Sequence, residues 1–237
     1  MSVRLKRVLP SSRALGVLLG VSFAVAIVLQ VAFAFVSRPL VWDAAVYFGM
    51  ARAFASLGAS GLWESLRPPV WPFVWSVLVA FKLPVIAAKL IQASAALCLG
   101  FLAYLYARRW SEWLGVVAAV FAWFAPLIVF APHQLLTEIP AVFFGLLALF
   151  LFVRRRPFLA GLVGGIAFLT KFPMGLVIVA LGISCVIDKK WRDAVRVGVG
   201  ALIPVIPYLV FNQVLYGDAI EPFIVGSRVI AEAGIWL

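Results

Sequence analysis

The sequence predicts an all-α protein, a multi-pass transmembrane helical bundle with about seven spans. Of its 237 residues, 65% are hydrophobic and 12% are charged, whereas soluble domains have about 45–50% apolar and about 25% charged residues. Several uncharged runs also approach the roughly 20 residues that a helix needs to cross a bilayer, without the alternation of barrel strands. The composition excludes a disordered chain and argues strongly against a soluble globule.

The first predicted span covers residues 14–36, an uncharged run that follows Arg4, Lys6, Arg7 and Arg13. A cleaved signal peptide is the alternative, because Ala32-Phe33-Ala34 resembles a cleavage site, although the run is longer than the apolar part of a typical signal peptide. The topology predicted for the rest of the chain is the same whether this segment is retained or cleaved.

An outer loop at residues 37–84 follows the first span and is expected to contain two helices. Apolar residues recur at helical spacing on one face of residues 42–57, which predicts a helix lying along the membrane surface; they are Trp42, Val46, Gly49, Ala53 and Leu57. Residues 68–82 form an apolar run of fifteen residues, too short to cross as a helix of about 1.5 Å rise per residue. This run predicts a re-entrant or interfacial helix.

Six further spans are predicted, at residues 85–107, 113–131, 139–153, 158–170, 174–187 and 194–215. The fifth and sixth spans of the chain lie between two basic clusters, and basic loops belong on the cytoplasmic side. An even number of crossings must therefore separate those clusters, which predicts two short helices with their turn at Thr170-Lys171-Phe172-Pro173, below the outer headgroups. Pro204 and Pro207 are expected to kink the last span.

The distribution of charge predicts the orientation. The formal net charge is +11, and the proposed cytoplasmic segments hold 13 of the 20 Lys and Arg residues with only 3 of the 9 acids. The N-terminus is thus expected inside and the C-terminus outside, in an integral protein of the plasma membrane. Because nearly all of the excess charge reports orientation, it gives no reason to expect a nucleic-acid partner. Cys98 and Cys185 lie in apolar runs and are expected to pack rather than to form a disulfide.

The outer loops hold six acids, which orientation does not require, so they are the place to look for chemistry. Asp43, with Tyr47 one turn later, is either an N-cap or a carboxylate at the membrane rim that acts as a general base. Arg67, before Pro68-Pro69, is either an arginine that reaches to the interface or a ligand for phosphate, which suits the guanidinium fork.

Three further residues complete the candidate set. Glu138, after Thr137, either complements the dipole of the next helix, with Thr137 as its cap, or lies in a site, because that helix is short. His133 is either a structural or a binding residue. Lys171 favours a functional role, because an ionisable side chain at membrane depth is costly and the short hairpin makes the reach to water long.

These motifs, in this order, resemble the GT-C superfamily of membrane glycosyltransferases. The resemblance rests on Asp43 with Tyr47 and Arg52, then RPPVWP, LLTEIPA and GGIAFLTKFP. The nearest members in pattern are the protein O-mannosyltransferases and the aminoarabinose transferases of lipid A. It extends over about residues 15–223 and departs from many relatives in having Ala44 where a second acid follows the first. Relatives also continue with more spans, so residues 1–237 correspond to a single N-terminal module.

The resemblance implies a glycosyltransferase that moves a sugar (a hexosyl or pentosyl group) from a polyprenyl-phosphate donor to an acceptor hydroxyl of a lipid, glycan or protein. Transfer would take place outside the cytoplasm, with inversion at the sugar. It implies that Asp43 is the catalytic base, that Arg67 and Lys171 hold the donor phosphate, and that Glu138 shapes the site or assists a metal. No cofactor is required by the pattern, although a divalent cation stays open. Two alternatives are a non-catalytic or truncated subunit whose partner supplies the missing spans, and a lipid or solute transporter.

Overall fold

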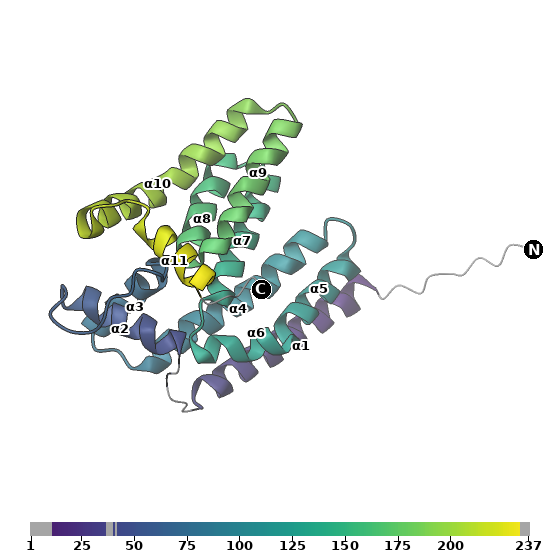
Figure 1. The fold of residues 1–237 in the computed structure, drawn as a ribbon. Coiled ribbons are helices and arrows are strands. Elements are labelled where there is room, and N and C mark those ends of the chain that lie inside the picture. The colour runs from purple at the N-terminus through teal and green to yellow at the C-terminus, as the bar shows by residue number, and fades with distance from the viewer. Residues whose placement is uncertain (1–10, 37–39, 41, 233–237) are drawn as a thin grey trace, which may run out of the picture.

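The computed structural model describes residues 11–36, 40 and 42–232, and throughout these residues every regular element is a helix (Figure 1). The prediction of an all-α fold is confirmed. Several of the helices are apolar and could span a membrane, so a membrane protein is plausible.

Three helices are long and apolar enough to cross a bilayer: α1 (Ser12–Ala34), α4 (Val85–Ala107) and α10 (Trp191–Tyr216). A fourth candidate is α5 (Glu112–Phe124) taken together with α6 (Pro126–Phe130) and the 3₁₀ segment η1 (Ala131–Gln134), which are bent by 54° relative to α5. Helices α7 (Glu138–Val153), α8 (Pro157–Thr170) and α9 (Gly175–Ile187) match the predicted elements, but each is shorter than the three long apolar helices. The described chain therefore has three or four candidate spans, and the count of seven is not confirmed.

The span predicted at residues 113–131 is not one continuous helix. The helix stops at Phe124, and Ala125 has φ −59° and ψ 129°. The ring of Pro126 disfavours the α-helical region for the residue before it, and this proline then begins the next helix. The bend follows from this local restriction.

The two helices predicted between the first and second spans are present as α2 (Asp43–Ala55) and α3 (Val70–Ala80). The buried face of α2 differs from the apolar face predicted from the spacing. Ala44, Tyr47 and Ala51 are buried in a cluster with Trp71 and Trp75 of α3, while Trp42 is 87% and Leu57 is 97% exposed. This face of α2 is buried because its small alanines let the large indole rings of α3 approach closely.

Helices α8 and α9 form the expected hairpin, with Lys171 and the 3₁₀ segment η2 (Phe172–Met174) at its turn. Helix α8 packs closely on α10 through glycines. A Cβ atom on Gly161 would overlap the Val197 carbonyl, and one on Gly165 would lie 2.7 Å from the Ala201 carbonyl oxygen. Contacts of this kind between small residues are typical of helices that associate in membranes. The order of the contacts shows that α8 and α10 run parallel.

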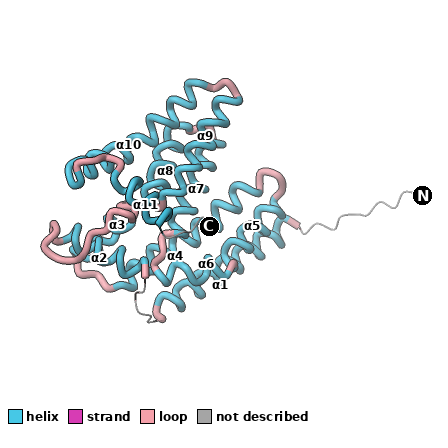
Figure 2. Tube along the Cα trace, in the orientation of Figure 1, coloured by secondary structure: helices cyan, strands magenta, loops and turns pink. Residues whose placement is uncertain are grey.

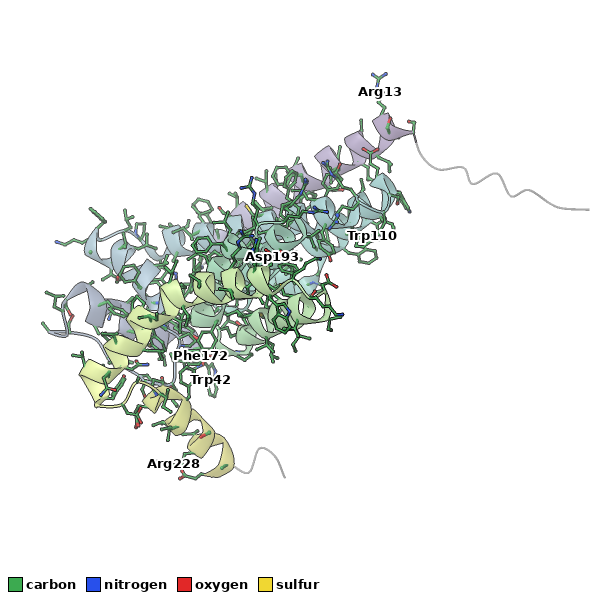
Figure 3. All side chains as sticks on the ribbon, turned by 90° about the horizontal axis from the view of Figure 1, so that it is seen from above. Arg13, Trp42, Trp110, Phe172, Asp193 and Arg228 are labelled. Carbon is green, nitrogen blue, oxygen red and sulfur yellow. The ribbon has the colours of Figure 1, made fainter. Side chains whose placement is uncertain are left out.

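Two groups of helices diverge from a common region in Figure 1: α1, α4 and α5 in one, and α7, α8, α9 and α10 in the other. Contacts between α4 and α7 join the groups. In the first group, Arg13 at the start of α1 and Trp110 after α4 lie at the same end (Figures 1 and 3). Helix α10 contains Pro204 and Pro207, and its ribbon changes direction along its length in both views. Helix α11 (Glu221–Glu232) follows α10 and ends the described chain.

The close contact between α8 and α10 makes a testable prediction about stability. In Gly200→Leu, the new side chain would meet Phe158 and the backbone nitrogen of Leu162, 2.8 Å from the added Cβ. We expect this overpacking to cost about 1–3 kcal/mol, measured as a lower melting temperature in detergent. Gly198→Leu is the matched control, because a Cβ there, two residues away on α10, has no atom within 4 Å. Equal losses in both variants would contradict the packing argument.

Candidate functional site

Asp43 and Arg67 form an ion pair at the outer-loop end of the fold. The Arg67 Nη2 atom lies 2.8 Å from Oδ1 of Asp43, and the two side chains are 29% and 40% exposed. Asp43 is the first residue of α2, and Arg67 lies in the loop that leads to α3. The pair therefore connects the start of α2 to the loop that leads into α3.

The N-cap role considered for Asp43 is wrong in this structure. The capping position is taken by Trp42, which makes no side-chain cap and has φ 50° and ψ −127°. Positive φ is unfavourable for a residue with a side chain as large as indole. Asp43 instead stands in the first turn, where a carboxylate complements the helix dipole while its oxygens point to Arg67.

A second acid, Glu64, completes the surroundings of Arg67. Its Oε1 atom lies 3.4 Å from Arg67 Nε, and the guanidinium carbon lies 5.9 Å from the centre of the Tyr47 ring. Partial burial lowers the pKa of Arg67, but the charges of Asp43 and Glu64 together raise it, and the net direction is upward. Arg67 is therefore a fixed cation with two carboxylate partners. Sequence reasoning counted Glu64 among the outer acids and did not single it out; only its i,i+3 spacing from Arg67 could have suggested the pair.

Tyr47 connects this pair to the loop before α7. Its hydroxyl lies 3.4 Å from Oγ1 of Thr137, so Thr137 does not cap α7 as expected but contacts α2 instead. Burial raises the pKa of Tyr47, which keeps the phenol protonated at neutral pH and able to donate a hydrogen bond.

Glu138 and Lys171 form the other half of the site. Lys171 Nζ lies 2.5 Å from Glu138 Oε1, and each side chain is 36% exposed. Glu138 begins α7, where it complements the helix dipole, and Lys171 follows the last residue of α8. The other carboxylate oxygen of Glu138 is buried without a hydrogen-bond partner. Glu138 directly follows Thr137, whose hydroxyl contacts Tyr47, so the backbone links this pair to Tyr47.

The structure thus brings five of the six predicted site residues into one chain of contacts: Asp43, Tyr47, Arg67, Glu138 and Lys171. His133 is the exception. It is 7% exposed within η1, and its ring lies 5.9 Å from that of Phe33 in α1. This packing favours the structural role considered for His133 over a binding role.

The charges of the cluster determine what it can bind. Its cations, Arg67 and Lys171, are each held by a carboxylate, and three acids face these two cations. An incoming anion would therefore replace a carboxylate as the partner of a cation, and the replaced carboxylate would become free to accept a proton. Within the described chain, no group of three or more His, Cys, Asp or Glu residues is arranged to hold a metal ion.

The chain was also compared with known proteins. No protein-family model matches it, and neither a curated protein nor a solved structure does.

The Glu138–Lys171 contact makes a second testable prediction. In a double-mutant cycle with Glu138→Gln and Lys171→Gln, we expect a coupling energy of about 0.5–1 kcal/mol, because the pair is partly exposed. The same cycle on Lys190 and Asp188, whose side chains are 57% and 50% exposed, is expected to give a smaller value. Thermal or denaturant unfolding in detergent measures both, and a coupling of zero between Glu138 and Lys171 would contradict the arrangement.

Proposed function

We propose that the chain is a membrane glycosyltransferase of the GT-C type that moves a sugar from a polyprenyl-phosphate donor to an acceptor hydroxyl. The observation that carries the proposal is the chain of contacts that links the Asp43–Arg67 pair to the Glu138–Lys171 pair through Tyr47 and Thr137. A transferase of this kind needs a carboxylate base and fixed cations for a phosphate leaving group, and the cluster supplies both.

An apolar groove beside the cluster supports a donor with a lipid chain. The groove has a volume of about 400 Å³ and is lined by Ala53, Phe54, Leu57, Gly58, Trp63, Phe211 and Leu215. Trp63 directly precedes Glu64, the second partner of Arg67, and its indole donates a hydrogen bond to Tyr216 of α10. An isoprenoid chain in this groove would place its phosphate near Arg67.

The proposed reaction is a single displacement. The donor phosphate pairs with Arg67 and Lys171, which releases Asp43 from its ion pair. Asp43 then takes the proton of the acceptor hydroxyl while the acceptor oxygen forms a bond to the anomeric carbon. The bond from that carbon to the phosphate oxygen breaks, and the polyprenyl phosphate leaves with the electron pair, stabilised by the two cations. One displacement from the opposite face inverts the anomeric centre.

Asp43→Asn tests the assignment of the base. We expect it to lower transfer from a polyprenyl-phosphate sugar by about 10²–10⁴-fold, measured with labelled sugar in reconstituted vesicles. Glu64→Gln is the comparison: it also removes a carboxylate beside Arg67 but leaves the proposed base in place, so transfer should fall far less than in Asp43→Asn. Full activity of Asp43→Asn would refute its role, and a wild-type chain without transfer activity would refute the proposed function.

The proposed topology has seven spans in the plasma membrane, with the N-terminus cytoplasmic and the cluster outside. It places α7, α8 and α9 across the bilayer in spite of their length, with the Lys171 turn below the outer surface. Four crossings, by α1, α4, the bent α5–α6 pair and α10, would instead return the chain to the cytoplasm after α10.

Cysteine labelling distinguishes these topologies. In a Cys98→Ser/Cys185→Ser background, Ser60→Cys and Ser227→Cys introduce one exposed thiol each, in the outer loop and in α11. Seven spans predict that a membrane-impermeant maleimide labels both from outside intact cells. Labelling at residue 60 together with protection at residue 227 until the membrane is permeabilised would favour four spans.

A further inference from the structure

The end of the α7–α10 group opposite the candidate site is strongly basic. Two loops make up this end: the α7–α8 loop with Arg154, Arg155 and Arg156, and the α9–α10 loop with Lys189 and Lys190. Figure 2 shows both loops at one end of the group. With Arg192 and Arg196 in the first turns of α10, seven basic residues face two acids, Asp188 and Asp193.

Helix packing brings these loops together. Because α8 and α10 run parallel, with Gly161 against Val197 and Phe158 against Gly200, their first residues lie side by side. The electrostatics agree: a hydrogen bond to Asp188 raises the pKa of Lys190, and the nearby charge of Arg155 opposes that rise. The two basic loops therefore lie at the same end of the helix group.

The α9–α10 loop and the start of α10 surround a concave pocket of about 540 Å³, lined by Lys189, Lys190, Trp191, Arg192, Asp193 and Arg196. Two of its cations are positioned by acids. Lys190 Nζ lies 2.6 Å from Asp188 Oδ2, and Arg196 Nη1 lies 3.0 Å from Asp193 Oδ1. Among the salt bridges of the described residues, none includes Lys189 or Arg192. The pocket thus combines oriented donors with uncompensated positive charge.

We propose that this basic pocket binds the headgroup phosphate of an anionic phospholipid of the surrounding bilayer. It lies where apolar helices end, the level at which headgroups meet a membrane protein, and Trp191 at its rim is 62% exposed, as is usual for an aromatic side chain at the interface. Basic pockets between helices on the cytoplasmic side are suited to anionic headgroups. Binding here is independent of the proposed transfer reaction.

A role in orientation alone does not account for the pocket. The α4–α5 loop also carries two arginines, Arg108 and Arg109, but their guanidinium groups lie 5.4 Å and 5.7 Å from the ring centres of Tyr104 and Tyr106. These arginines supply the same charge for orientation and stack on tyrosines of their own helix. The α4–α5 loop therefore provides a matched control.

The experiment measures lipid binding to the purified full chain in detergent by native mass spectrometry, with phosphatidylglycerol as the probe and phosphatidylcholine as the neutral reference. We expect Lys189→Gln/Arg192→Gln to weaken binding of phosphatidylglycerol about 30-fold, at about 1 kcal/mol for each cation. Arg108→Gln/Arg109→Gln removes equal charge and should bind like wild type. The charge-conserving variant Lys189→Arg should also bind like wild type.

Several outcomes would overturn the proposal. These are an unchanged affinity in the Lys189/Arg192 variant, an equal loss in the Arg108/Arg109 variant, and displacement of the lipid by inorganic phosphate at equal concentration, which would assign the pocket to a free anion. Because a misfolded double variant would mimic a loss of binding, Lys189→Gln alone is measured beside it. This single variant is expected to bind about fivefold more weakly while keeping the melting temperature of the wild type in phosphatidylcholine.

Discussion

The confinement of charge to helix ends is the constraint on which the organisation of α7–α10 depends. A charged side chain in the middle of an apolar helix is costly, and between their ends α7, α8 and α9 carry none. Because consecutive helices run in opposite directions, their ends alternate. Glu138 and Lys171 therefore meet at one end, and the Arg154–Arg156 and Lys189–Lys190 loops meet at the other.

Glycine residues allow two of these helices, α8 and α10, to pack closely along their length. Gly161, Gly165 and Gly200 let α8 and α10 approach until backbone lies on backbone, and this close contact aligns the start of α10 with the start of α8. The start of α10 in turn lines the basic pocket. Helices α2 and α3 use large side chains instead: Trp71 and Trp75 of α3 pack on Ala44, Tyr47 and Ala51 of α2. That packing brings Asp43 within reach of Arg67.

Sequence reasoning selected most residues of the candidate site but could not identify their partners. Acids beyond those that orientation needs indicated Asp43 and Glu138, a guanidinium before a proline pair indicated Arg67, and a lysine at the turn of a short hairpin indicated Lys171. Pairing was not predictable, because Lys171 and Glu138 are 33 residues apart and Tyr47 and Thr137 are 90 apart. For the same reason Thr137 was expected to cap its own helix, a local role.

The sequence by itself determined the all-helical class, the extent of most helices and the segregation of charge, since these follow from local hydrogen bonding and from the length and polarity of each segment. The tertiary structure decided which face of α2 is buried, that Thr137 contacts Tyr47, and that each cation of the site is held by a carboxylate. These features depend on contacts between segments distant in the chain, where shape and packing select among partners of similar chemistry.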